Sequence, residues 1–147
     1  MKRGKFRKGV FVVTYAKKGN KIEYLILKRK HHWNGWEFPK GGMKLFEGKN
    51  HAAKREVREE SGLRTRKIKK FNYSGKYKYN KEYKDRLGTI GQTFSLYAAE
   101  VKRGKVKIDK HEHAGHEWMT FEKAMKKLTW SNQKECLKIV NKWLEIK

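Results

Sequence analysis

Two stretches near the N-terminus have the apolar content of neighbouring β-strands. Val10 to Ala16 and Ile22 to Arg29 are rich in Val, Ile, Tyr and Leu, which favour pleated, half-buried strands. Residues 17–20 between them read Lys-Lys-Gly-Asn, and Gly and Asn suit a tight turn. The pattern therefore predicts a β-hairpin.

The polar and apolar spacing then changes to that of a helix. Residues 49–61 have good helix propensity, and Ala53 and Val57 are four positions apart on one helix face. Gly62 suits the left-handed conformation that closes many helices. Before this helix, residues 31–40 contain Pro39, which disfavours helix in the preceding residue. We therefore predict a loop with a short extended segment, followed by a helix over 49–61.

The second half of the chain predicts two further strands and two helices. Residues 67–79 and 93–101 carry strand-type residues, and the polar residues 80–91 between them indicate an exposed loop. Thr120 is a suitable N-cap for a short helix over 121–128. Ser131 similarly caps a final helix to Leu144, whose apolar face is formed by Cys136, Leu137, Val140, Trp143 and Leu144. This order of elements predicts a mixed α/β sandwich.

Length and composition favour one domain over residues 1–147. The chain has 147 residues and no Pro-, Gly- or Ser-rich divider. We interpret residues 1–8 as a basic N-terminal extension. Neither a signal-peptide pattern nor an apolar run of about 18 residues is present, so we expect a cytoplasmic protein without a membrane segment. The single cysteine, Cys136, is expected to be a small buried hydrophobe.

The net charge of +24 favours polyanionic partners such as nucleotides or RNA. A merely solvated Lys-rich surface explains the same composition. The chain has 39 Lys and Arg but 15 Asp and Glu, and three of these carboxylates, Glu56, Glu59 and Glu60, fall within five residues. On a helix Glu56 and Glu60 share one face, with Glu59 at its edge. Such hard oxygen ligands suit Mg²⁺ or Mn²⁺, so the cluster predicts a metal site.

The carboxylates belong to a longer spaced pattern, G-x5-E-x7-R-E-U-x-E-E-x-G-U with U aliphatic, in residues 41–63. Its seven fixed identities are Gly41, Glu47, Arg55, Glu56, Glu59, Glu60 and Gly62. Chance produces such a match about once in 10^9 starting positions at ordinary residue frequencies. The segment resembles the Nudix box of hydrolases that act on nucleoside diphosphate linkages. One departure is that Leu45 and Phe46 stand where many members have Pro-Gly.

The resemblance implies a Nudix-type α/β/α sandwich with a mixed central β-sheet, and a box loop and helix that carry the metal site. It implies Glu56 and Glu60 as principal metal ligands, Glu59 as a supporting ligand or activator of water, and Gly41 as a carbonyl ligand. Arg55 and Glu47 are implied to pair, which would hold the loop against the helix. The identity of the general base varies in the family and stays open.

Two stretches outside the box indicate which groups of Nudix hydrolases the chain is most similar to. Residues 36–42, Trp-Glu-Phe-Pro-Lys-Gly-Gly, are similar both to asymmetric dinucleoside tetraphosphate hydrolases and to RNA 5′-pyrophosphohydrolases. Lys40 matches the first group and is implied to contact phosphate, while Trp36 is either a substrate-binding or a core residue. Residues 112–118, Glu-His-Ala-Gly-His-Glu-Trp, are similar to the first group, which implies Glu112 as a further metal ligand or base.

The remaining candidate residues are expected to contact the substrate. Gln92 follows a glycine, a pair more similar to the RNA enzymes, and Tyr77 and Tyr79 alternate on a strand where they either stack a base or form a plain sheet face. A further group, His111, His113 and His116, is accompanied by no cysteine or second cluster, so zinc is not expected there.

The leading hypothesis is a Mg²⁺-dependent (or Mn²⁺-dependent) hydrolase of nucleoside polyphosphates that cuts diadenosine tetraphosphate into ATP and AMP. The alternative is an RNA 5′-triphosphate pyrophosphohydrolase, favoured by the charge, Gly42 and Gln92, with RNA along the basic residues 64–86. A third is a non-catalytic nucleotide- or RNA-binding module, which the complete set of box carboxylates disfavours.

Overall fold

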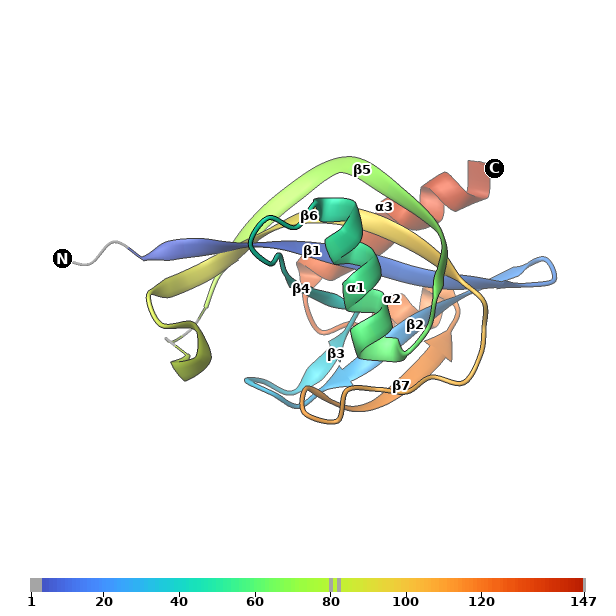
Figure 1. Cartoon of the computed structure of the whole chain (residues 1–147). Coiled ribbons are helices and arrows are strands. Elements are labelled where there is room, and N and C mark those ends of the chain that lie inside the picture. The colour runs from blue at the N-terminus through green and yellow to red at the C-terminus, as the bar shows by residue number, and fades with distance from the viewer. Residues whose placement is uncertain (1–3, 80, 82, 147) are drawn as a thin grey trace.

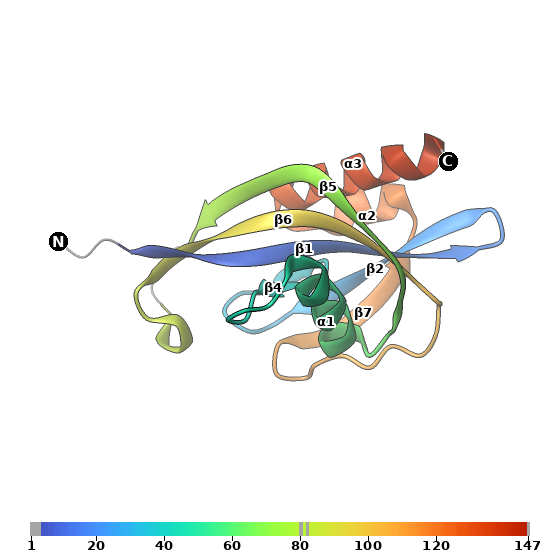
Figure 2. The same ribbon diagram turned by 45° about the horizontal axis from the view of Figure 1, so that its top comes forward.

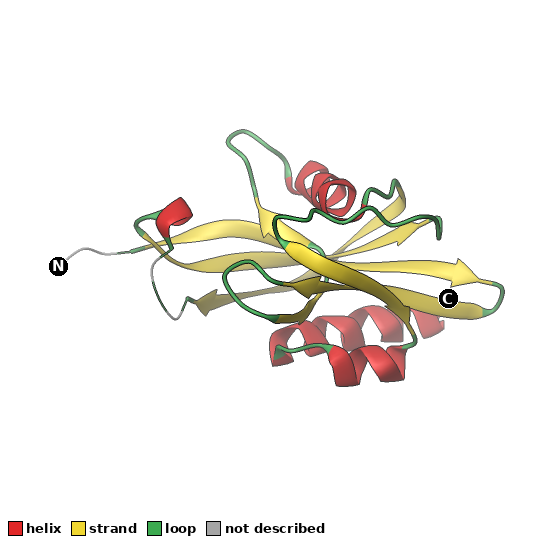
Figure 3. Ribbon diagram, turned by 90° about the horizontal axis from the view of Figure 1, so that it is seen from below, coloured by secondary structure: helices red, strands yellow, loops and turns green. Residues whose placement is uncertain are grey.

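The computed structural model, which describes residues 4–79, 81 and 83–146, is an α/β sandwich with a mixed sheet between two helical layers. Helix α1 (Lys49–Ser61) covers one face, and α2 (Phe121–Lys127) and α3 (Ser131–Ile146) cover the other (Figures 1 and 3). The predicted fold class is confirmed.

The seven strands form one sheet in the order β3-β2-β1-β6-β5, with β4 also paired to β1 and β7 to β2. Their bounds are Lys5–Lys18 for β1, Lys21–Arg29 for β2, Gly35–Glu37 for β3, Lys40–Gly42 for β4, Thr65–Lys78 for β5, Thr89–Val101 for β6 and His113–Met119 for β7. Strands β1 and β6 run parallel, whereas β1 and β2 form the predicted antiparallel hairpin.

The sequence of β1 explains why both faces of the sheet are covered. Its side chains alternate between faces, so Val10 and Val12 pack in the cluster that includes Ala53 and Val57 of α1. Phe11 and Val13 pack in the other cluster, which includes the apolar residues of α3. Because both faces of β1 are buried, each in a different hydrophobic cluster, the strand has an unbroken run of apolar residues.

Strand β4 and the loop after it place α1 over the sheet beside β1 (Figure 2). Gly41 pairs with Val10 of β1. The chain then turns through residues 43–48 and enters α1, whose predicted bounds are confirmed. Gly62 closes the helix at φ 74°, and its N–H donates to the carbonyl of Arg58 at 2.8 Å.

Several predicted boundaries were wrong. Strand β1 already begins at Lys5, so the second half of the predicted basic extension is part of the sheet and pairs with β6; residues 1–3 lie outside the described residues. The predicted loop at 80–91, of which 80 and 82 are also outside the described residues, contains the short helix η1 (Lys84–Arg86) and the start of β6. Helix α2 ends at Lys127, and α3 continues to Ile146. Strand β7 was not predicted.

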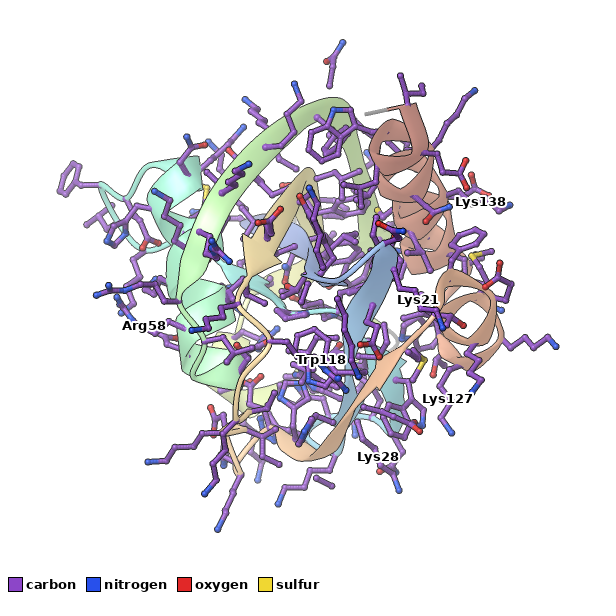
Figure 4. All side chains as sticks on the ribbon, turned by 90° about the vertical axis from the view of Figure 1, so that its right-hand side faces the viewer. Lys21, Lys28, Arg58, Trp118, Lys127 and Lys138 are labelled. Atoms are coloured by element: carbon purple, nitrogen blue, oxygen red, sulfur yellow. The ribbon has the colours of Figure 1, made fainter. Side chains whose placement is uncertain are left out.

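Basic side chains are spread over both helical layers. Arg58 projects outward from α1, and Lys127 and Lys138 project from α2 and α3 on the other side of the sheet (Figure 4). The net charge is therefore not confined to one face. Within the described residues, no helix combines the length and apolarity needed to span a bilayer.

Candidate active site

A cavity of about 700 Å³ lies where α1, β4 and the loop before β7 meet. It is lined by five carboxylates, those of Glu56, Glu59, Glu60 and Glu112, which the sequence indicated, and that of Asp109, which it did not. The other predicted site residues that line it are Lys40, Gly41, Arg55, Tyr77, Tyr79 and Gln92. Ten of the predicted site residues, from distant parts of the chain, thus lie around one cavity, while their roles stay predictions.

The carboxylates of α1 are crowded, and two of the three are buried. Glu56 and Glu60 are buried, whereas the Glu59 side chain is 46% exposed. Burial, opposed by Arg55 and assisted by Glu59 and Glu112, raises the pKa of Glu56 to about 7. Burial and the nearby negative charges of Glu37 and Glu56 raise the pKa of Glu60 well above its ordinary value. Because the ionised forms are costly in this arrangement, a bound cation would stabilise them.

Arg55 fixes the box loop to α1. Its Nε donates to Glu47 Oε2 at 2.7 Å and its Nη2 to Glu47 Oε1 at 2.8 Å, which is a bidentate pair. Nη1 donates to Glu56 at 2.7 Å, and Nη2 also donates to the carbonyl of Gly42 at 2.9 Å. Hydrogen bonds from Arg55 hold the pKa of Glu47 well below its usual range. Arg55 therefore connects the loop, β4 and a predicted metal ligand, as implied for this pair.

We expect Arg55→Lys to reduce metal-dependent hydrolysis about 10–100-fold, because loss of an outer partner of a metal ligand typically has effects of this size. Lysine keeps the charge but has no planar fork with which to hold Glu47 and Glu56 together. The matched control is Arg58→Lys on the outward face of the same helix, which should keep the wild-type rate. Equal rates for the two variants would contradict the role assigned to Arg55.

The Glu56 carboxyl group lies so close to the backbone of residue 41 that only glycine fits there. A Cβ atom at residue 41 would collide with the Glu56 carboxyl group. We expect Gly41→Ala to displace that carboxylate and to lower metal affinity and hydrolysis about 10–100-fold, as other disturbances around metal ligands do. In Gly115→Ala the new Cβ has no neighbour within 4 Å among the described residues, so this control should match the wild type. Titration of each variant with Mg²⁺ in a hydrolysis assay measures the difference.

Lys40 places a positive charge between the carboxylates and the aromatic wall of the cavity. Its Nζ donates to the Tyr77 hydroxyl at 3.1 Å and lies 3.6 Å from Glu37 Oε1. The same atom is 5.1 Å from the Tyr77 ring centroid and 5.5 Å from that of Trp33. Burial lowers the pKa of Lys40, but the Glu37 carboxylate and the Tyr77 hydroxyl together offset this and raise the pKa above its ordinary value. Lys40 is thus a fixed cation at neutral pH.

Glu112 is brought to the cavity by Arg29. The Nη1 atom of Arg29 lies 3.2 Å from Glu112 Oε2 and 3.1 Å from Oε2 of the fully buried Glu37. The carbonyl of Glu112 also accepts hydrogen bonds from the N–H groups of Lys30 and His31. The loop before β7 is therefore attached to the end of β2, with its carboxylate on the cavity side.

The aromatic wall differs in part from the prediction. Tyr79 donates to Gln92 at 3.2 Å and accepts from Arg86 at 3.1 Å, which fixes two of the predicted substrate contacts. Trp36 does not line the cavity. It packs against the core next to α2, and Lys127 Nζ lies 4.6 Å from its ring centroid.

Trp33 and Trp130 line the cavity instead of Trp36, with centroids 5.3 Å apart and planes at 72°. Trp33 lies within residues 31–40, where the sequence predicted a loop with a short extended segment. Trp130 lies far from it in the sequence and carries no comparable signal. The sequence of residues 31–40 does not show whether Trp33 or Trp36 faces the core.

Comparisons with known proteins support the resemblance of residues 41–63 to the Nudix box. A family model of the NUDIX domain matches residues 5–138. Among curated proteins, no match to this chain is found. An Ap4A hydrolase of C. elegans in a binary complex is 24% identical over 96% of this chain and 99% of its own, with a TM-score of 0.76.

Two further solved structures have the same fold. A Nudix hydrolase of Listeria monocytogenes is 23% identical over 96% of this chain and 94% of its own, with a TM-score of 0.76. The Nudix domain of NrtR from Shewanella oneidensis, solved with ADP-ribose, is 12% identical over 97% of this chain and 90% of its own, with a TM-score of 0.75. At these identities the likeness concerns the fold.

Proposed function

Because this chain belongs to the Nudix family, we propose that it is a Mg²⁺-dependent hydrolase of nucleoside polyphosphates, with Mn²⁺ as a substitute metal. We further propose that it cuts diadenosine tetraphosphate asymmetrically, into ATP and AMP. The hydrolase class follows from family membership together with a complete box. The substrate and the metal are supported by the geometry of the cavity.

The observation that carries the proposal is the position of Lys40 between acidic and aromatic groups. Its backbone N–H donates to Glu60 at 3.1 Å, while its ammonium group lies against the rings of Tyr77 and Trp33. A polyphosphate chain at this point would lie beside a fixed cation and the carboxylates, with aromatic surface on which bases can stack. A volume of about 700 Å³ is in the range of ligand sites.

The donor set fits a hard divalent cation. Glu56, Glu60 and Glu112 offer carboxylate oxygens, Glu59 is adjacent, and Gly41 leaves room beside Glu56 because it has no Cβ. All are oxygen ligands, which Mg²⁺ and Mn²⁺ prefer. When bound, the cation would polarise phosphate oxygens and lower the pKa of a coordinated water.

The protein's own groups would complete the reaction. One of the cavity carboxylates would accept the proton of the attacking water. The water oxygen would form a new bond to phosphorus as the bond to the bridging oxygen breaks, and Lys40 would offset the negative charge that builds on the phosphate. Arg55 and Arg29 would keep Glu56 and Glu112 in position, since each donates to, or pairs with, one of these carboxylates.

One observation favours an RNA 5′-end as a second candidate substrate. The cavity lining includes the basic residues Arg7, Lys44, Lys78 and Arg86. These cations could contact phosphates beyond the first nucleotide of a long substrate, and such binding would weaken with salt more strongly than binding of a dinucleotide.

The test is product analysis with diadenosine tetraphosphate and a 5′-triphosphorylated RNA offered in one buffer with Mg²⁺. We expect ATP and AMP from the first substrate and intact RNA. Faster release of phosphate or pyrophosphate from the RNA would replace the dinucleotide proposal with the RNA 5′-end activity. If neither substrate is turned over, the non-catalytic binding module becomes the better account. Glu56→Gln serves as the control for a contaminating hydrolase.

A further inference from the structure

Histidines that the proposed hydrolysis does not use gather at the rim of the cavity. His31 and His32 follow β2, and Asp85 lies in η1 more than fifty residues later. The β2–β3 loop and η1 lie near one another at one end of the molecule (Figure 1). His32 Nε2 is 3.3 Å from Asp85 Oδ1, and His31 Nε2 is 3.7 Å from Asp85 Oδ2.

These separations match the coordination of zinc. The candidate ligand atoms of all three residues lie within 4.8 Å of one another. With Zn–N and Zn–O bonds of about 2.0–2.2 Å, tetrahedral geometry places ligand atoms roughly 3.3–3.5 Å apart. The His32 distance of 3.3 Å falls in this range, and the His31 distance of 3.7 Å, which runs to the other Asp85 oxygen, lies slightly above it.

The backbone at this point also departs from ordinary loop conformation. His32 adopts φ 72°, a left-handed conformation that costs energy in residues other than glycine. Its consequence is that two consecutive imidazole rings lie together, with centroids 3.8 Å apart. Consecutive side chains in an extended segment would instead point to opposite faces.

We propose that His31, His32 and Asp85 form a binding site for a zinc-class transition metal ion, separate from the carboxylate site. Two imidazole nitrogens and one carboxylate suit Zn²⁺, whereas the all-oxygen set of α1 suits Mg²⁺. Arg86 is a competing partner, because its Nε lies 3.5 Å from Asp85 Oδ1. That contact is long, and the Asp85 side chain is half exposed, so Asp85 can turn from Arg86 to the ion.

The sequence did not predict zinc because it pointed to other histidines. His113 is buried, and its Nε2 lies 2.8 Å from Glu37, while His116 is exposed on β7. Only His111 of that group is near the present site, where its ring lies 4.4 Å from that of His31. His31 and His32 are adjacent in the sequence, but only the fold brings Asp85 to them.

A bound ion would connect two loops at the entrance of the cavity. The His32 ring stacks on Tyr83 at 3.9 Å, and both residues line the cavity. Zinc with three protein ligands keeps a fourth position for water or a substrate oxygen. The site would therefore hold the β2–β3 loop against η1 and place a second type of cation at the substrate entrance.

The test is calorimetric titration of the full chain with Zn²⁺ in excess Mg²⁺, which keeps the carboxylate site filled. We expect one Zn²⁺ per chain, with affinity reduced at least about tenfold in His31→Gln and in Asp85→Asn. His116→Gln is the matched control and should bind as the wild type does. Circular dichroism of each variant verifies that the fold is kept.

Co²⁺ gives an independent readout, because tetrahedral sites with nitrogen ligands absorb visible light much more strongly than octahedral oxygen sites. We expect strong bands in the wild type and in His116→Gln, and their loss in His31→Gln and in Asp85→Asn. Absence of Zn²⁺ binding in excess Mg²⁺ would overturn the proposal, as would binding that neither substitution weakens. Neither readout depends on hydrolysis, so failure of the zinc site and failure of the proposed function are distinguishable.

Discussion

Glu60→Gln should reduce Mg²⁺-dependent hydrolysis of diadenosine tetraphosphate by about 10²–10³-fold, since metal assistance contributes several kcal/mol to such reactions. Glutamine keeps the shape of the side chain and can still accept the hydrogen bond from the Lys40 N–H, but it removes the charge that would bind the cation. Initial rates over a range of Mg²⁺ concentrations measure the effect.

The stability of the same variant separates a chemical role from a structural one. Because burial and like charges raise the pKa of Glu60, the ionised carboxylate opposes folding of the metal-free protein. The metal-free Glu60→Gln protein should therefore unfold at a temperature no lower than the wild type. The exposed Glu117, on β7, provides the control Glu117→Gln, which should keep both rate and stability. A Glu60→Gln protein with the wild-type rate would contradict the assignment of the site.

Glu37→Gln should cause the largest loss of stability, about 3–5 kcal/mol, which is typical when one partner of a buried ion pair is removed. Glu37 is fully buried and accepts from Arg29 at 3.1 Å and from His113 at 2.8 Å, with Lys40 Nζ at 3.6 Å. A neutral residue at position 37 removes the carboxylate beside Lys40 and leaves Arg29 paired with Glu112 alone. Urea unfolding at neutral pH measures the difference in the free energy of unfolding.

An exposed ion pair provides the comparison for Glu37. Glu135 lies 3.1 Å from Lys138, and both side chains are more than half exposed; such pairs contribute about 0–1 kcal/mol. Glu135→Gln should therefore be nearly neutral. Equal stabilities of the Glu135 and Glu37 variants would mean that the buried network does not hold Lys40 and Arg29 in place.

Elements with a strong local pattern were predicted well. The box helix has its apolar contact line at Ala53 and Val57 and a glycine at its C-terminus, and its bounds agree with the structure. Strand β7 has the sequence His-Ala-Gly-His-Glu-Trp-Met, of which the N-terminal His113 and the C-terminal Met119 are buried. Its strand conformation depends on pairing with β2. Similarly, Lys5 to Lys8 form a strand because β6 offers backbone partners, and neither partner is visible in a local pattern.

The site likewise contains residues that the sequence indicated and residues that it did not. The spacing of the box predicted the carboxylates of α1, and resemblance beyond it indicated Lys40 and Glu112, which line the same cavity. Trp33 lies in the loop before β3 whereas Trp36 belongs to β3, so the pairing of this strand with β2 decides which tryptophan faces the core. The partners of Glu37, and the approach of His31 and His32 to Asp85, arise only when distant segments are folded together.

The most direct test of the central claim is anomalous diffraction from crystals soaked with Mn²⁺ and a non-hydrolysable analogue of diadenosine tetraphosphate. The account predicts Mn²⁺ between the analogue's phosphates and the carboxylates of Glu56 and Glu60, with Lys40 beside the phosphates. Manganese bound elsewhere, with the analogue outside this cavity, would contradict it.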